Sequence, residues 1–136
     1  MATELNILIN DQSIRHPLIK ENIAVVDLDK LEPIYTKIFI GDALTCIGFN
    51  DVLNFLSKVK SKLLPGGQIQ LEEYDLMELS LALINDTISS ADFNNVMRHR
   101  QQTVTLFDAC DVLVKAGFKI LSKDLDALKH TIIATL

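Results

Sequence analysis

The stretch Leu63-Leu64-Pro65-Gly66-Gly67 lies between a segment with helical periodicity and a segment with strand periodicity. Upstream, apolar residues recur every three or four positions from residue 52 onward, as on one face of a helix. Downstream, residues 68–72 alternate polar and apolar side chains, as in a strand. Pro65 cannot continue a helix, and the two glycines can take a positive φ without steric cost. We therefore predict that a helix ends at this stretch and that the chain then enters a sheet.

The rest of the chain alternates between the same two patterns. Short apolar or β-branched runs predict strands at 5–9, 23–26, 38–40, 68–72, 118–121 and 131–134. Helical spacing predicts a helix up to Pro65, with Asn50 or Asp51 as its N-cap, and further helices over 77–88 and 105–116. We expect a loop with one or two helical turns over 10–22, and a polar, mobile excursion over 89–103.

Strands that alternate with helices predict an α/β fold with a mainly parallel sheet and helices on both faces. The last two predicted strands are joined by about nine residues that show no helical pattern. Because a parallel crossover needs a longer connection, we expect these two strands to be antiparallel. The 136 residues suit one domain, 1–136, and leave no room for a second.

Composition excludes several classes of function. A net charge of −5 argues against binding to nucleic acid or to anionic lipid, because both need a surplus of Lys and Arg. No apolar run approaches the roughly 20 residues that cross a bilayer, and no signal-like segment opens the chain, so we expect a cytoplasmic protein and no membrane contact. Cys46 and Cys110 are far apart and are interpreted as reduced thiols. The scattered histidines predict no metal site.

Four segments, in the correct order, resemble motifs of the class I S-adenosylmethionine-dependent methyltransferases, and the similarity is to their type 11 branch. Val25-Val26-Asp27-Leu28 resembles the end of the family's second strand, and residues 42–47 resemble the end of its fourth. The stretch 63–67 matches the family's Pro-Gly-Gly turn. Residues 113–118 match its junction between the last helix and the next strand.

The resemblance implies a Rossmann-like, doubly wound, seven-stranded sheet whose C-terminal strand is antiparallel. It implies S-adenosylmethionine as cofactor, bound at the carboxyl ends of the first strands, and a small-molecule methyl acceptor. Asp27 would accept hydrogen bonds from the ribose hydroxyls, with Leu28 beside it, and Asp42 would lie near cofactor or acceptor. Asn10 and Asp11 stand in the cofactor loop. The alternatives are that Asp27 is a turn or cap residue, that Asn10 and Asp11 are turn residues, and that Asp42 caps the segment that follows it. Methyl transfer depends mainly on alignment, so no catalytic residue is assigned.

The sequence departs from the family pattern in two places. The glycine-rich loop after the first strand is replaced by residues 9–13, Ile-Asn-Asp-Gln-Ser. About ten residues separate Asp27 from Ile38, which is too few for a helix and another strand. We therefore predict a degenerate cofactor loop and a sheet that lacks one edge strand. The strand at 23–27 would then be an edge, covered either by residues 30–37 or by a second copy of the chain.

Two functions remain open from the sequence. The chain is a methyltransferase, or it is a non-catalytic binding or structural module with the same fold that has lost its cofactor. Three carboxylates at the end of the fourth predicted strand, Glu72, Glu73 and Asp75, are interpreted as a solvated strand end, with a role as base as the alternative. The basic cluster Arg98-His99-Arg100 is interpreted as a solvated loop, with substrate covering as the alternative.

Overall fold

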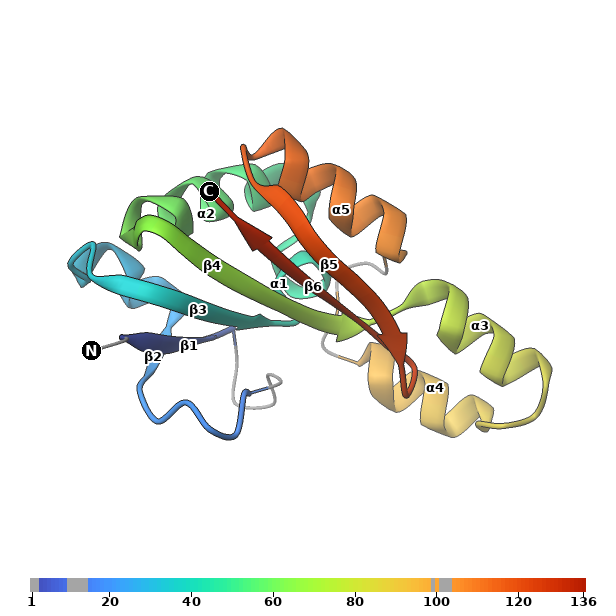
Figure 1. Cartoon of the computed structure of the whole chain (residues 1–136). Helices are drawn as coiled ribbons and strands as arrows, with labels where there is room; N and C mark the ends of the chain where they lie inside the picture. The colour runs from blue at the N-terminus through green and yellow to red at the C-terminus, as the bar shows by residue number, and fades with distance from the viewer. Residues whose placement is uncertain (1–2, 10–14, 99, 101–103) are drawn as a thin grey trace.

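The computed structural model describes residues 3–9, 15–98, 100 and 104–136 (Figure 1). Within those residues, six strands form one sheet in the order β2-β1-β3-β4-β6-β5. Their bounds are β1 Glu4–Leu8, β2 Asn22–Ala24, β3 Tyr35–Gly41, β4 Leu63–Tyr74, β5 Lys119–Asp126 and β6 Lys129–Thr135. Strand β6 is antiparallel to both of its neighbours, and the other pairs are parallel. The predicted α/β fold, with a mainly parallel sheet and one antiparallel C-terminal strand, is confirmed.

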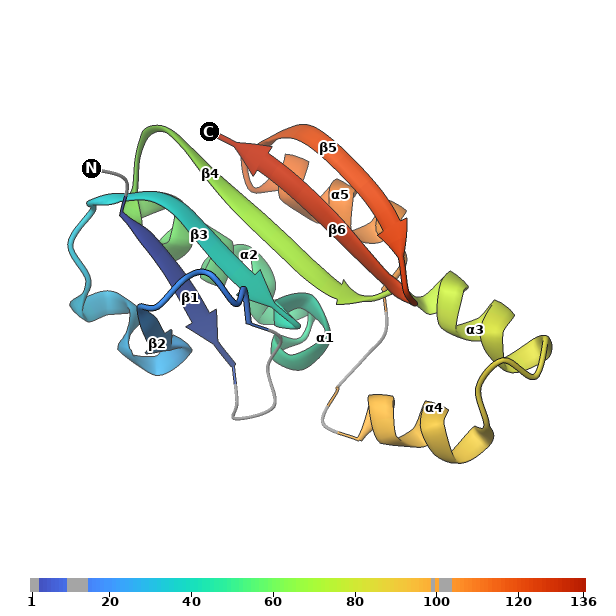
Figure 2. The same cartoon turned by 60° about the horizontal axis from the view of Figure 1, so that its bottom comes forward.

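The helices are placed unevenly about this sheet. They are η1 (a 3₁₀ helix) Val25–Lys30, α1 Ala43–Ile47, α2 Phe49–Lys62, α3 Leu76–Ile84, α4 Ser90–Met97 and α5 Leu106–Lys115. Helices α2 and α5 lie on the same face of the sheet, and α3 and α4 project beyond the end of β4 (Figures 1 and 2). In the part of the chain that the structure describes, no helix is long and apolar enough to cross a membrane.

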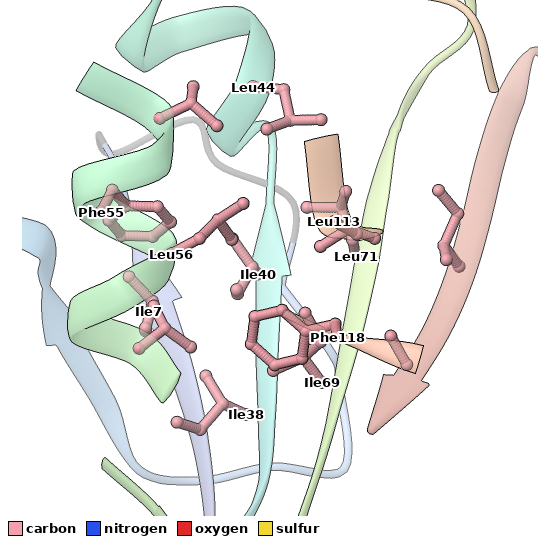
Figure 3. Close-up of a cluster of buried hydrophobic side chains, with 14 of the residues drawn as sticks. Ile7, Ile38, Ile40, Leu44, Phe55, Leu56, Ile69, Leu71, Leu113 and Phe118 are labelled. Atoms are coloured by element: carbon pink, nitrogen blue, oxygen red, sulfur yellow. The ribbon is translucent and has the colours of Figure 1, made fainter. Parts of the chain in front are cut away.

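The main core lies between the sheet and helices α2 and α5 (Figure 3). Alternate residues of β3 and β4 point toward the helices, among them Ile40 and Leu71, and both are fully buried. Leu56 of α2 and Leu113 of α5 meet them from the helix side. Because full burial of such a side chain contributes roughly 1.5–3 kcal/mol, this layer is the main source of stability in the sheet.

An irregular segment covers part of the opposite face. Asn6 of β1 is almost fully buried there; its amide donates to the carbonyl of Ile19 at 3.0 Å and its oxygen accepts from the amide of His16 at 3.0 Å. The His16 ring meets Phe39 of β3 edge-on, with centroids 5.5 Å apart. The described part of the segment, residues 15–22, has a single hydrogen-bonded turn at 17–18, and one buried asparagine holds it by its backbone; residues 10–14 of the predicted loop lie outside the described residues.

The stretch 63–67 ends α2 as predicted. Leu63 is extended and pairs with Tyr35, and the next paired residues are Lys37 and Gln68, so residues 64–67 form a bulge between the two bridges. Gly66 has a φ of +77°. A Cβ on Gly67 would lie 2.8 Å from the carbonyl oxygen of Leu64, so the bulge requires glycine there.

Several predicted boundaries are wrong. The N-cap position of α2 is Gly48, and Asn50 and Asp51 lie inside the helix, because the short helix α1 precedes it. Strand β2 ends at Ala24, so the second half of the predicted strand belongs to η1. Residues 90–97 form helix α4 instead of an irregular excursion, since Ser89 and Asp92 make a capping box.

The last two strands are longer than predicted. The described residues between them are only Ala127 and Leu128, which have φ values of 50° and 71°. Two consecutive positive φ values are typical of the type I′ turn that matches the twist of a hairpin. The antiparallel prediction is therefore confirmed, with a much shorter connection than the sequence pattern indicated.

Candidate functional site

Polar side chains gather where β3 and β4 end. Asp42 follows β3 directly and is 2% exposed. Its backbone is left-handed, with φ 60° and ψ 19°, a conformation that aspartate tolerates better than most residues. The Asp42 amide donates to the carbonyl of Glu72 on β4, and its carbonyl accepts from the amide of Cys46 in α1. The turn at Asp42 therefore joins two strand ends to a short helix.

Arg100 is ion-paired with Asp42. One guanidinium nitrogen, Nη2, lies 2.8 Å from Asp42 Oδ1, and the two side chains are only 10% and 3% exposed. The guanidinium also stacks over the ring of Tyr74 at 4.9 Å and donates from Nη1 to the carbonyl of Val96. The prediction of a solvated loop is wrong for Arg100, which instead connects the end of α4 to the carboxyl ends of β3 and β4.

Glu73 and Asp75 are buried, so the prediction of a solvated strand end is wrong for both. Glu73 Oε2 accepts from the amide of Thr45 in α1 at 3.1 Å. Asp75 caps α3 by accepting from the amide of Glu78 at 3.0 Å, and it accepts from the amide of Leu106 in α5 at 2.7 Å. These two carboxylates thus hold the starts of three helices.

His130 of β6 lies between the same two carboxylates. Its Nδ1 is 2.8 Å from Asp75 Oδ1, and its Nε2 is 3.6 Å from Glu73 Oε1. Burial disfavours the charged ring, but the hydrogen bond to Asp75 and the negative charges of Glu73 and Asp75 outweigh it, and the pKa of His130 is raised. Burial also raises the pKa of Glu73.

A second feature lies between η1 and α2, where an open cavity of about 240 Å³ is found. Its walls are Val25 and Leu28 of η1, Ile47 of α1, and Asp51, Asn54, Phe55 and Lys58 of α2. Asp27 lies within η1 rather than at a strand end. Its carboxylate pairs with Lys30 at 2.9 Å, where Asp27 is 41% exposed.

The residues predicted to bind the cofactor therefore do not lie together in one pocket. Leu28 lines the cavity, Asp27 is on the neighbouring surface of η1, and Asp42 lies in the buried pair with Arg100. Asn10 and Asp11 lie outside the described residues. Ile47 ends the helix that begins after Asp42, and five helical residues span about 8 Å. The cavity and Asp42 are thus at opposite ends of α1.

Cys46 lies in α1 and is half-buried. Burial raises the pKa of its thiol, so the sulfur stays protonated near neutral pH. The pKa of Cys110 is raised in the same way. Because only the thiolate is strongly nucleophilic, neither cysteine is suited to covalent catalysis.

The buried contacts of Arg100 and His130 were not predicted from the sequence. One signal was present for Glu73: in the alternating strand it has the same parity as Ile69 and Leu71, so it had to face the core. No local pattern indicates His130, because its partners Glu73 and Asp75 are more than fifty positions away.

No protein-family model and no curated protein matches the sequence. Solved structures do match. An S-adenosylmethionine-dependent methyltransferase from Archaeoglobus fulgidus superposes with a TM-score of 0.62 at 16% identity, over 97% of this chain and 75% of that one. One from Methanosarcina mazei gives 0.63 at 13%, over 97% and 81%. Magnesium protoporphyrin IX methyltransferase from Synechocystis, with S-adenosylhomocysteine bound, gives 0.56 at 15%, over 85% and 50%.

These similarities concern the arrangement of the chain, since the sequence identities are low. The mainly parallel sheet of this chain, with the single antiparallel strand β6, superposes on those proteins as a Rossmann-like fold. Within the described residues the sheet has six strands, as expected from the shortened segment between β2 and β3. The chain has the Rossmann-like fold of the S-adenosylmethionine-dependent methyltransferases.

Proposed function

We propose that this protein binds S-adenosylmethionine and transfers its methyl group to a small-molecule acceptor. The observation that supports this most is the cavity between η1 and α2, next to the carboxyl end of β2, in a fold shared with S-adenosylmethionine-dependent methyltransferases. Open α/β sheets bind ligands outside the carboxyl ends of their strands. The cavity lies against η1, which follows β2 and carries Asp27, and Asp42 follows β3 directly.

The residues that line the cavity are suited to one part of the cofactor, its adenine base. Val25, Leu28 and Ile47 give the cavity apolar walls suited to a planar base, and Asn54 adds an amide at its rim. A volume of about 240 Å³ lies below the roughly 300 Å³ at which pockets for whole drug-sized ligands begin. We therefore assign the adenine to this cavity and the rest of the molecule to the surface that leads along α1 toward Asp42.

The chain's own residues would act by positioning. Asp27 would accept hydrogen bonds from the ribose hydroxyls after its carboxylate leaves Lys30, an exposed pairing worth little. Asp42 would face the positive sulfonium end. When bound, S-adenosylmethionine supplies the reactive methyl group, and holding the acceptor in line with it accounts for most of the expected rate enhancement.

Titration calorimetry with S-adenosylmethionine and S-adenosylhomocysteine tests this proposal. Asn54→Trp should fill the cavity from the exposed face of α2 and abolish the binding heat. Leu53→Trp is the matched control, since Leu53 is the next residue, is 48% exposed and does not line the cavity. Asp27→Ala should weaken binding roughly tenfold, the loss of about one charged hydrogen bond. No heat at millimolar ligand, or equal affinity in all variants, would contradict the proposal.

The alternative is a non-catalytic module with the same fold. The observation in its favour is that Asp42 is already paired with Arg100 in a nearly dry setting, where opening the pair is costly. A module of this kind would show no binding heat for the wild type and none for Arg100→Gln. If Arg100→Gln gains affinity for S-adenosylhomocysteine, the ion pair competes with the ligand and the methyltransferase proposal stands.

Three finer expectations belong to the same proposal: membership of the type 11 branch with a degenerate cofactor loop, a cytoplasmic location, and association of two copies through residues 23–27. The two free cysteines suit a reducing compartment. Strand β2 is the edge of the sheet, as expected, although it is only three residues long. Light scattering of Val26→Asp tests the edge contact, because a pairing through η1 and β2 would not tolerate a charge there.

A further inference from the structure

Glu73 and His130 form a buried pair whose facing atoms have no other partner. Both side chains are 0% exposed, and His130 Nε2 lies 3.6 Å from Glu73 Oε1. In the part of the chain that the structure describes, neither atom has a hydrogen-bond partner, and 3.6 Å is too long for an ordinary hydrogen bond. Because a buried polar atom without a partner is costly, each of these two atoms depends on the other.

The geometry requires one proton between these two atoms. Asp75 accepts hydrogen bonds from two backbone amides, so it also accepts from His130, and Nδ1 of the ring carries a hydrogen. Nε2 then faces Glu73 Oε1 either as a bare nitrogen or as an N–H group. A bare nitrogen opposite a carboxylate oxygen brings two lone pairs together away from water, whereas a proton on either atom makes the contact attractive. The pair therefore shares a proton.

The pair lies beside the buried ion pair of Asp42 and Arg100. The last register pair of β3 and β4 immediately precedes Asp42 and Glu73, so these two residues are neighbours at the strand ends. Thr45 contacts both: its amide donates to Glu73 Oε2 and its hydroxyl donates to the carbonyl of Asp42, each at 3.1 Å. Burial raises the pKa of Glu73, and the charge of Asp42 raises it further. The charge at Asp42 thus acts on the shared proton.

Other groups around the pair come from several elements. Strand β4 contributes Asp75, which binds the ring, and α1 contributes Cys46, a thiol whose pKa is raised by burial. Strand β5 places the uncharged Leu125 opposite the histidine, and α3 and α5 contribute the amides that Asp75 binds. Lys129 and Glu72 lie on the other face of the sheet, 3.8 Å apart. The charges nearest the shared proton are therefore the carboxylates of β4 and the ion pair at Asp42.

These charges do not balance without the proton. Asp42, Glu73 and Asp75 are buried carboxylates, and Arg100 is the cation that pairs with the first of them. A further positive charge at Asp42 stabilises the ionised form of Glu73, so it weakens the hold of the pair on its proton. Binding of a cation at Asp42 and binding of the proton therefore oppose each other, and the coupling is reciprocal.

We propose that the proton shared by Glu73 and His130 is released to solvent when a cation binds at Asp42, so that the pair selects a cationic ligand over its uncharged counterpart as pH rises. The proposal rests on the function proposed above for the identity of that cation, the sulfonium of S-adenosylmethionine; S-adenosylhomocysteine has an uncharged sulfur instead. Arg100 stays in place because opening a buried ion pair is costly, so the sulfonium adds a charge. Glu73 and His130 act through Asp42 and need not touch the ligand.

Two substitutions that break the same ion pair test the coupling without a ligand. Arg100→Gln removes a positive charge, so the titration of the pair, followed by NMR at the His130 side chain of isotope-labelled protein, should move up by on the order of one pH unit. Asp42→Asn removes a negative charge beside Glu73 and should move the titration down by a similar amount. Asparagine tolerates the left-handed backbone of position 42. If the ion pair had only a structural role, its loss would move both titrations in the same direction.

Two further variants are the controls. Arg100→Lys keeps the cation and should titrate like the wild type. Arg98→Gln removes a positive charge from an exposed side chain two residues away and should leave the titration unchanged. Shifts of the same sign in Arg100→Gln and Asp42→Asn, or no shift in either, would overturn the proposal. If one of these two variants does not fold, the sign of the shift in the other decides.

Titration calorimetry tests the selectivity. Binding heats measured in two buffers of different ionisation enthalpy, at the pH where the pair titrates, count the protons released. S-adenosylmethionine should release more protons than S-adenosylhomocysteine, and its affinity alone should rise with pH, by roughly tenfold. Glu73→Gln should abolish the difference. Equal proton counts for the two ligands would overturn the selectivity and leave the proposed function standing. Absence of binding contradicts the proposed function, and the NMR shifts then decide the coupling.

Discussion

Asp75 makes more contacts than its position at a strand end indicates. Its carboxylate caps α3, accepts from the first amide of α5 and pairs with His130 of β6. Each contact uses a different element of the fold. A carboxylate with this many hydrogen bonds is buried without a large penalty, because its charge is compensated on every side.

Asp75→Asn keeps the volume of the side chain and removes its charge. We expect the free energy of unfolding to fall by about 2–4 kcal/mol, since the His130 ring loses its charged partner inside the protein. Urea denaturation followed by circular dichroism measures this. Asp111→Asn is the control: Asp111 pairs with Lys115 on the surface of α5, where both side chains are 64% exposed, so the change should be within about 0.5 kcal/mol. Equal losses in the two variants would contradict the role of Asp75.

His130 makes stability depend on pH. Its folded pKa is raised above the unfolded value of about 6.5, so the folded state holds the proton more tightly. The resulting stability is fully present below pH 6.5 or so and is lost as pH rises through the folded pKa. We expect the free energy of unfolding to decrease above about pH 6.5, and the slope to flatten in His130→Gln.

Urea unfolding at several pH values measures this slope. His16→Gln should keep it, since the ring nitrogen of His16 accepts from the amide of Leu18 rather than facing a carboxylate. The raised pKa of Glu73 acts in the same direction, because it too favours the protonated form in the folded state. A slope of opposite sign would show that desolvation of the ring outweighs its two carboxylates.

The bulge at 63–67 shows why two adjacent glycines are not equivalent. Gly66 needs its left-handed φ but has no atom within 4 Å of an added Cβ. Gly67 has an ordinary φ but no space, because an added Cβ meets the carbonyl of Leu64. The first requirement is conformational and the second is steric.

We expect Gly67→Ala to destabilise the protein by about 1–3 kcal/mol, because the clash is with backbone that cannot move away. Gly66→Asn should cost less than about 1 kcal/mol, since asparagine tolerates the left-handed region. Thermal unfolding of the two variants, compared at the same pH, tests the order. If Gly66→Asn is the less stable variant, the close approach of the Leu64 carbonyl is not the stronger constraint on this bulge.

At the scale of elements, α4 depends on its own sequence more than on packing. It has a capping box and no buried residue. Helix α5 has a similar box, made by Thr105 and Asp108, but buries Ala109 and Leu113 in the core. The two helices therefore have similar N-caps, but only α5 is also stabilised by packing in the core.

Removal of the N-cap side chain should therefore have different effects on the two helices. Ser89→Ala should speed amide exchange over residues 90–97 while global stability changes little, because α4 unfolds locally. Thr105→Ala should lower the free energy of global unfolding by about 1 kcal/mol, since α5 is part of the core. Hydrogen exchange by mass spectrometry, with urea denaturation of the same samples, distinguishes the two results. Protection of residues 90–97 that survives Ser89→Ala would show that contacts other than the cap hold α4.

Sequence patterns predicted best those elements that are determined by residues close together in the sequence. The helix end at 63–67, the amphipathic helix over 105–116 and the last strand depend on neighbouring residues, and the structure confirms them. Helix α4 was missed although its signature, Ser89 followed three residues later by Asp92, is in the sequence. Strand β2 was overextended because Val25 and Val26 favour strands, while the structure folds them into η1.

Across the whole fold, the class of sheet could be predicted and the candidate site could not. The mainly parallel sheet with an antiparallel C-terminal strand follows from the resemblance of four ordered segments to a known fold, and the missing edge strand follows from counting residues between 27 and 38. The contacts Asp42–Arg100 and Asp75–His130 join positions 58 and 55 residues apart. No periodicity or motif reports on such pairs, since they arise only when separate elements pack together.

The two edges of the sheet are protected against pairing in different ways. Strand β5 carries charged residues along its length, among them Lys119 and Asp126, and has a register irregularity between Ile120 and Ser122. Charges and bulges both discourage the addition of a further strand. Strand β2 offers only three residues. A strand added at that edge could pair only with Asn22–Ala24.

Strand β6 comes last in sequence among the described strands, yet it lies inside the sheet, between β4 and β5. During synthesis the ribosome releases β5 before the strand that attaches it to β4 exists. Until residues 129–135 emerge, the sheet can pair only from β2 to β4, and His130 is absent from its two carboxylates. A nascent chain stalled before Lys129 should therefore stay sensitive to protease along residues 104–126, and the chain should become resistant in one step when β6 inserts. Resistance that rises gradually before that point would show that α5 and β5 dock without β6.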